Sequence, residues 1–266
     1  MRMMTSSCLN LMLVLAGLAP AAVAQSGPER MVQGIAASAA LDPRSAATAF
    51  EAILSRDSLN AEANWRAALA LVDIGKQTPE TVKSPARDSL FRLADRYARR
   101  AIRLAPNDAD AHFTLAMAAG MTALTVGIRQ QVGYAIEVRE EALRALQIDP
   151  AHDGAMHVLG RWHAEIKRVS GVELFFAKSF LGGKVFGEAS WHEAARLLEA
   201  SVAHRPSFIL HRLDLALVYV DQKRYAAARA QLAVIPTLPT QDVLDPVHRA
   251  QAVSLGARIA RKRDGD

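Results

Sequence analysis

The chain has 266 residues, a formal net charge of +5 at pH 7 and 51% hydrophobic residues, which suffices for one or two domains with a sizeable core. Its only cysteine, Cys8, lies near the N-terminus, which excludes disulfides, thiolate catalysis and thiolate metal sites from the rest of the chain. Acidic and basic residues are mixed, as between Arg87 and Arg103, whereas a nucleic-acid-binding protein would need a dense basic stripe with interleaved aromatic residues. We therefore expect no nucleic-acid partner.

Residues 1–24 have the pattern of a secretory signal peptide. Arg2 gives a weak positive start, residues 9–18 are mostly apolar, and Ala22-Val23-Ala24 is a small-x-small cleavage site. The apolar run is short for a spanning helix, although an uncleaved membrane anchor is the alternative, and no second run of about 18 apolar residues follows. We predict cleavage after Ala24, and a soluble mature chain of residues 25–266 that forms one domain in the periplasm or outside the cell.

Alanine- and leucine-rich helical patterns follow the predicted cleavage site. After a polar lead-in at residues 25–33, Asp42-Pro43 begins the first clear helix, because aspartate caps a helix start and proline lacks only an N–H that is unbonded there. This helix has the pattern of the second half of an incomplete, capping repeat. The first full helix pair covers 61–75 and 90–104, with an enlarged loop at 76–89 that contains two prolines.

The next helix pair runs from Asn107 to Pro150. Asn107 and Asp108 supply side-chain oxygen atoms for the free N–H groups of its first helix. A second enlarged loop is expected at 121–133, before the returning helix.

The clearest repeat signature lies between residues 156 and 232. Leu159-Gly160 opens a helix, Ala194 lies in the returning helix, Pro206 ends it, and Leu215-Ala216 opens the next helix with Tyr219 four residues later. The small residue after each leading leucine lets paired helices approach closely, and the tyrosine fills the space beside the next pair. This pattern is typical of tetratricopeptide repeats, although the prolines at 106, 150 and 206 are farther apart than the about 34 residues of a plain repeat.

We therefore predict an all-α fold, a tetratricopeptide-like helical-hairpin solenoid with enlarged loops inside its repeats. The largest insertion is the apolar stretch 168–190 within the third pair. A closing pair follows at 211–221 and 226–235, and a capping helix at 246–262 covers it. No segment has a convincing period-two strand pattern.

Several short motifs occur between Asp149 and Ala257. They are Asp149-Pro150, His157-Val158-Leu159-Gly160-Arg161-Trp162, Phe180-Leu181-Gly182-Gly183, Ala194, Pro206, Leu215 to Tyr219, and Tyr225-Ala226-Ala227-Ala228. Together they resemble the regulator of microtubule dynamics family, which implies a helical solenoid used for protein contacts, without catalytic residues. The insert departs from the expected Gly-x-Pro-Pro form at Gly183-Lys184-Val185-Phe186-Gly187. Because the predicted signal would export the chain from a bacterial-type cytoplasm, we do not carry over a role on microtubules.

The sequence contains no evident catalytic or metal-binding motif. His157 and His163 are six residues apart and therefore lie on different faces of a helix, and the eight histidines lack the spacing of a metal-ligand array. A Gly-x-Ser-x-Gly elbow and a phosphate-binding loop are also missing. We predict capping or surface histidines, no metal or other cofactor, and no enzymatic activity.

Binding is the better hypothesis, on the concave face that the first helices of stacked pairs line. The candidate contact residues are Trp65, Leu69, Asp73, Phe113, Met117, Met121, His157, Arg161 and Glu165. Aromatic and methionine side chains offer adaptable apolar area, and an arginine can bind a partner carboxylate with two hydrogen bonds. The alternative is that Phe113 and Met117 belong to the core and that Arg161 pairs with Glu165 four residues on.

The insert 168–190 is the second candidate surface. It is too apolar to lie free in water, mainly because of Phe175, Phe176, Phe180 and Phe186. We expect it to pack back over the solenoid, where it could fill the concave groove; the alternative is an exposed surface that docks a partner or touches a membrane. Our main hypothesis is an exported scaffold or adaptor for a protein or peptide partner of unknown identity. The alternative is a small-ligand-binding module whose pocket the insert closes.

Overall fold

The computed structural model describes residues 26–171 and 183–266, and within these ranges the chain is helical, without strands. The first half comprises α1 (Gly27–Ala39), α2 (Pro43–Leu54), α3 (Ala61–Lys76), α4 (Pro85–Leu104), α5 (Ala109–Ala123) and α6 (Ile128–Ile148). The second half comprises α7 (Asp153–Arg168), η1 (Gly183–Glu188), α9 (Trp191–His204), α10 (Ile209–Asp221), α11 (Tyr225–Val234), η2 (Ile235–Thr237) and α12 (Asp245–Ile259). The predicted all-α helical-hairpin fold is confirmed.

The predicted polar lead-in at residues 25–33 is wrong, because α1 begins at Gly27. Ser26 accepts a hydrogen bond from the Glu29 backbone N–H, and the Glu29 side chain accepts one from the Ser26 N–H, which is a complete capping box. The helix then packs on α2 through Gly34, where a Cβ atom would lie 2.4 Å from Phe50 Cε1. The Ser26-to-Glu29 spacing was the signal in the sequence that could have revealed this helix.

The enlarged loops are shorter than the sequence suggested. The loop between α3 and α4 is 77–84, and the loop between α5 and α6 is 124–127, instead of 76–89 and 121–133. Ser84 caps α4 by accepting from the Arg87 N–H, so that Pro85 becomes the first helical residue. Most of the extra residues therefore lengthen α4 and α6, which have 20 and 21 residues.

Glycine allows close packing within two of the full helix pairs. A Cβ atom at Gly160 in α7 would lie 2.8 Å from Leu198 Cγ and 3.3 Å from the Ala194 carbonyl oxygen in α9. A Cβ atom at Gly75 in α3 would likewise lie 2.3 Å from Phe91 Cε1 in α4. Leu198 and Phe91 are almost fully buried as a result, which agrees with the role predicted for the small residue after Leu159.

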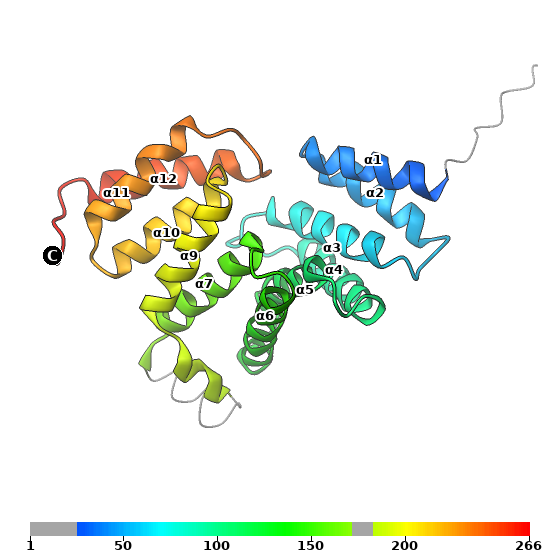
Figure 1. Ribbon diagram of the computed structural model, residues 1–266, viewed down its shortest axis with the longest axis horizontal. Helices are drawn as coiled ribbons and strands as arrows, with labels where there is room; N and C mark the ends of the chain where they lie inside the picture. Colours follow the sequence, from blue (N-terminus) through cyan, green and yellow to red (C-terminus); the bar gives the residue numbers. More distant parts are fainter. Residues whose placement is uncertain (1–25, 172–182) are drawn as a thin grey trace, which may run out of the picture.

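The pairs follow one another around an arc, with α1 and α2 at one end and α10 to α12 at the other (Figure 1). The first helices α3, α5, α7 and α10 contact each other in succession, which places them on the shorter, inner side of the arc. The two ends approach each other, because Lys76 Nζ in α3 lies 3.4 Å from Asp242 Oδ2 in the loop before α12. Helix α3 and the loop before α12 therefore meet across the opening of the arc.

Candidate partner-binding site

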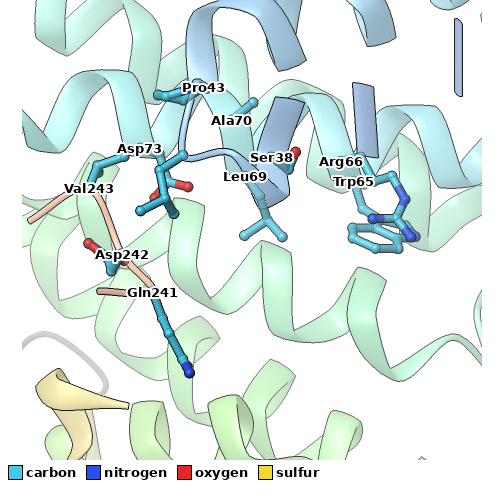
Figure 2. A pocket seen from close by; sticks show the side chains of 11 residues that line it. Ser38, Pro43, Trp65, Arg66, Leu69, Ala70, Asp73, Gln241, Asp242 and Val243 are labelled. Atoms are coloured by element: carbon cyan, nitrogen blue, oxygen red, sulfur yellow. The ribbon is translucent and has the colours of Figure 1, made fainter. Parts of the chain in front are cut away.

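A cavity of about 160 Å³ lies where α3 meets the loop before α12. We call it the α3 cavity, and its lining consists of Ser38, Leu41, Pro43, Trp65, Arg66, Leu69, Ala70, Asp73, Gln241, Asp242 and Val243. Figure 2 shows Trp65 and Arg66 at one end, Leu69 in the middle, and Asp73 beside the 241–243 loop at the other end. Three of the predicted contact residues, Trp65, Leu69 and Asp73, thus line one hollow.

Trp65 presents an unused hydrogen-bond donor. Its side chain is only 8% exposed, with the Arg66 guanidinium 4.2 Å from the ring centroid, and Arg66 is held by Glu62 at 2.8 Å. The indole Nε1 has no hydrogen-bond partner among the residues that the structure describes. This buried donor without an acceptor costs free energy, and Trp65 offers its ring to the lining of the cavity.

The other end of the α3 cavity has an excess of negative charge. Lys76 Nζ lies 2.9 Å from Asp73 Oδ1 and 3.4 Å from Asp242 Oδ2, so two carboxylates share one ammonium group. Burial alone would lower the pKa of Lys76, but the two carboxylates raise it above its ordinary value. Lys76 therefore stays charged, whereas burial and the neighbouring Asp242 raise the pKa of Asp73, so the two carboxylates compete for one ammonium group and a further cation would be favoured beside them.

A second polar group of the inner face joins α7 to α10. Asp214 Oδ2 lies 2.7 Å from His157 Nε2 and 3.6 Å from Arg161 Nε. Burial raises the pKa of Asp214, but Arg161 and His157 outweigh it and hold that pKa at about 2. The ring centroids of His211 and His157 are 4.7 Å apart, and His211 Nδ1 lies 2.9 Å from Ser201 Oγ. We call His157, Arg161, His211 and Asp214 the α7–α10 cluster.

The other predicted contact residues differ in how far they are accessible. His157 is buried in the α7–α10 cluster, whereas the Arg161 side chain is 44% exposed and lies 3.5 Å from Glu165. Phe113 and Met117 are half-buried against the core between pairs, as the core alternative proposed. Met121 is also half-buried, against the core that α3 and α4 share.

The histidines were predicted at the surface or at helix caps, and most of them are elsewhere. His152 does cap α7 by accepting from the Ala155 N–H at 3.1 Å. The buried histidines are His112, His157, His163, His211 and His248. His112, for example, contacts Glu141 of α6 and His157 contacts Asp214 of α10, so tertiary packing buries them and local hydrophobicity gives no warning of it. In the described part of the chain, no three histidine, aspartate or glutamate residues are arranged to hold a metal ion.

The described part of the insert packs against the solenoid. Phe186 in η1 is 4% exposed and contacts Val132, Trp162 and Ile166, with its ring centroid 6.0 Å from that of Trp162. Phe186 is therefore a core residue of this region and not a surface one, and it does not line the α3 cavity. The other three phenylalanines, Phe175, Phe176 and Phe180, lie outside the described residues.

No pattern in the sequence pointed to Lys76, Gln241, Asp242 or Asp214 as parts of a site. Lys76 and Asp242 are 166 residues apart, and only the curvature of the whole solenoid brings them together. Within the ranges 26–171 and 183–266, no helix is both long and apolar enough to cross a membrane.

Paired helices stacked into an arc, with an inner face formed by the first helices, define a tetratricopeptide-like repeat protein. The chain belongs to the family described as regulator of microtubule dynamics protein 1-3, whose model matches residues 36–258.

Solved structures show the same fold. The chain is similar to a thermophilic TPR protein of Thermus thermophilus, with a TM-score of 0.62, 18% identity, and coverage of 86% of this chain and 100% of that one. It is also similar to PilF of Pseudomonas aeruginosa, with a TM-score of 0.51, 15% identity, and coverage of 90% and 93%. A comparison with curated protein sequences finds no match.

Proposed function

We propose that this protein is an exported scaffold that holds a segment of a partner protein on its inner face, at the α3 cavity. The observation that carries the proposal is the division of the α3 cavity, which has the apolar side chains of Trp65 and Leu69 toward one end and the carboxylates of Asp73 and Asp242 at the other. An extended peptide fits this arrangement, with apolar side chains on Trp65 and Leu69 and a lysine or arginine near Asp73. No enzymatic activity is part of the proposal.

The test is capture of a partner by the full chain, followed by variants of the α3 cavity. Leu69→Glu places a charge in the middle of the cavity on a half-buried side chain, and we expect at least about tenfold weaker binding of the captured partner. Val247→Glu is the matched control, because Val247 is 50% exposed on α12 and lies outside the cavity. Equal binding by both variants would overturn the proposed site.

Export is a separate part of the proposal, supported by the apolar run and small-x-small site in residues 1–24. Expression of the full chain with its own N-terminus in a Gram-negative bacterium should give a periplasmic protein that begins at Gln25. A cytoplasmic protein that still begins at Met1 would contradict it. If the protein is exported, contact with microtubules, to which the name of the family refers, is not its role.

A small ligand is the second candidate, because the α3 cavity has the volume of a few side-chain-sized groups. The described part of the insert supplies none of the cavity's lining, so the proposed closure by the insert would depend on residues 172–182. A panel of metabolites distinguishes the two functions. A thermal shift with one compound, abolished by Leu69→Glu, favours the ligand-binding module over the scaffold.

A further inference from the structure

A second hollow, of about 430 Å³, lies between α11 and α12, and it is separate from the α3 cavity. A helix that covers the end of a solenoid normally presents a polar outer face to water. Helix α12 instead leaves the Val253 side chain 71% exposed at this hollow. We call the hollow the α11–α12 groove.

Two rows of side chains line the α11–α12 groove. One row consists of Arg229, Leu232 and Ala233 on α11, continued by Ile235 and Pro236 of η2, and the other of Arg249, Ala252, Val253 and Gly256 on α12. The α12 residues have the spacing i, i+3, i+4 and i+7 and form one stripe along that helix, and the α11 residues have the spacing i, i+3 and i+4. The floor is apolar and made largely of small residues, which lets the backbone of another helix approach closely.

The two arginines lie at opposite ends of the groove. Arg229 Nη1 donates to the carbonyl oxygens of Ile259 and Lys262, at 3.1 and 3.0 Å, beside the C-terminal end of α12. Arg249 donates to Leu238 O at 2.8 Å and to Thr240 Oγ1 at 3.0 Å, beside the start of α12. Ten helical residues separate Arg249 from Ile259, which corresponds to about 15 Å along the helix axis.

The hydrogen bonds of both arginines go to backbone and hydroxyl oxygens, and neither guanidinium forms an ion pair with a carboxylate among the described residues. Backbone and hydroxyl oxygens fix both guanidinium groups in place, while some of the five N–H donors of each remain available. The groove thus has an apolar floor between the guanidinium groups of Arg229 and Arg249, which are about 15 Å apart. A partner helix with an apolar face and an acidic residue near each end would complement it.

We propose that the α11–α12 groove binds an acidic amphipathic helix of a partner protein. The helix lays leucine-like residues at i, i+3/i+4 and i+7 on Val253 and Leu232. Its aspartate or glutamate residues, about ten positions apart, bind Arg229 and Arg249. With the α3 cavity on the inner face, the protein would then have two docking surfaces for two different kinds of segment.

The test uses the full chain and a fluorescent synthetic helical peptide with three leucines in that spacing and glutamates about ten residues apart. A second peptide carries lysines in place of the glutamates. We expect the glutamate peptide to bind at least about tenfold more tightly at low salt, and this difference to shrink as salt rises. Val253→Glu should abolish binding, whereas Val247→Glu, on an exposed part of α12 outside the groove, should leave it unchanged.

Several outcomes would overturn the proposal. Equal affinity for the two peptides would show that the arginines do not bind the acidic residues. An equal loss of peptide binding in Val253→Glu and Val247→Glu would show that the peptide does not bind in the α11–α12 groove. A dimer of the full chain that Val253→Glu dissociates would assign the groove to self-association. Binding of anionic lipid vesicles without binding of the glutamate peptide would assign it to a membrane surface. Circular dichroism of each variant confirms that the fold is kept.

Discussion

The inner face of the solenoid is held together by different contacts in its two halves. Between α3 and α5, the first helices meet through apolar side chains that include Leu71, Leu115 and Ala118. Between α7 and α10, a buried aspartate, Asp214, accepts a hydrogen bond from His157 instead. Apolar contacts are insensitive to pH, whereas a buried ionic contact depends on the protonation of every member. The two halves of one repeat architecture should therefore fail under different conditions.

Asp214→Ala should give the largest difference in stability between the two halves of the inner face. This change leaves His157 and Arg161 without their shared carboxylate, and removal of one partner of a buried ion pair costs about 3–5 kcal/mol. Hydrogen exchange followed by mass spectrometry should show faster exchange in α7 and α10 and little change in α3 and α5. Uniformly faster exchange across all helices would contradict the division into two halves.

The pH dependence of stability should come mainly from the α7–α10 cluster. Burial, together with the neighbouring His157 and Arg205, lowers the pKa of His211 from 6.5 to about 2. Below pH 6.5 the unfolded chain then binds a proton that the folded chain does not. The free energy of unfolding therefore falls as the pH drops, by up to ~1.4 kcal/mol per pH unit. Asp214, with its pKa lowered from 3.8 to about 2, adds a further loss below about pH 5.

His211→Gln isolates this pH effect, because glutamine can bond Ser201 but does not titrate. Urea denaturation at pH 7, 6 and 5 should give a flatter dependence for His211→Gln than for the natural chain. His192→Gln is the control, because the His192 side chain is 82% exposed on α9, and its slope should match the natural chain. A slope unchanged in His211→Gln would show that other groups cause the acid sensitivity.

Gly160→Ala should have a smaller effect, confined to the α7–α9 pair. The new Cβ atom would lie 2.8 Å from Leu198 Cγ and close to the Ala194 carbonyl oxygen, so we expect a loss of about 1–3 kcal/mol despite the better helix propensity of alanine. Gly120→Ala in α5 is the matched control. Its Cβ atom would meet only Val138 Cγ2, at 3.8 Å, and a gain of up to about 1 kcal/mol is expected. Equal urea midpoints for the two variants would refute the close approach.

The smallest effect is expected from Asp242→Asn, which weakens the contact between the two ends of the arc. Lys76 keeps Asp73 as a partner, and the asparagine oxygen can still accept from the Leu244 N–H, so the loss of stability should stay below about 1 kcal/mol. Amide exchange should accelerate in the 241–244 segment and at the end of α3. Faster exchange in the 241–244 segment alone, without a change at the end of α3, would mean that this contact does not stabilise both segments.

Local patterns in the sequence predicted those parts of the structure that depend on neighbouring residues alone. The Leu159-Gly160 and Leu215-Ala216 openings, the capping segment Asn107-Asp108, and the final helix near 246–262 all correspond to observed helices. The length of α4 is harder to predict, because a proline such as Pro85 often indicates a loop, whereas here Ser84 caps the helix and Pro85 is its first residue.

The candidate site was predictable on one side only. Trp65, Leu69 and Asp73 share one face of one helix, and helical periodicity alone places them together. The opposite side, formed by Gln241 and Asp242, depends on the sum of the rotations between all intervening pairs, which no local pattern encodes. The burial of His157 and His211 has the same cause, because the partner residues that cover them lie on other helices.

The Lys76–Asp242 contact also constrains how this architecture can evolve. Every helix pair adds a fixed rotation and rise, so an arc with one pair more or fewer would carry residue 242 far from α3. Many solenoids gain or lose repeats without harm to the others. Here such a change would open the arc and separate the walls of the α3 cavity, so the number of repeats is tied to the proposed binding surface.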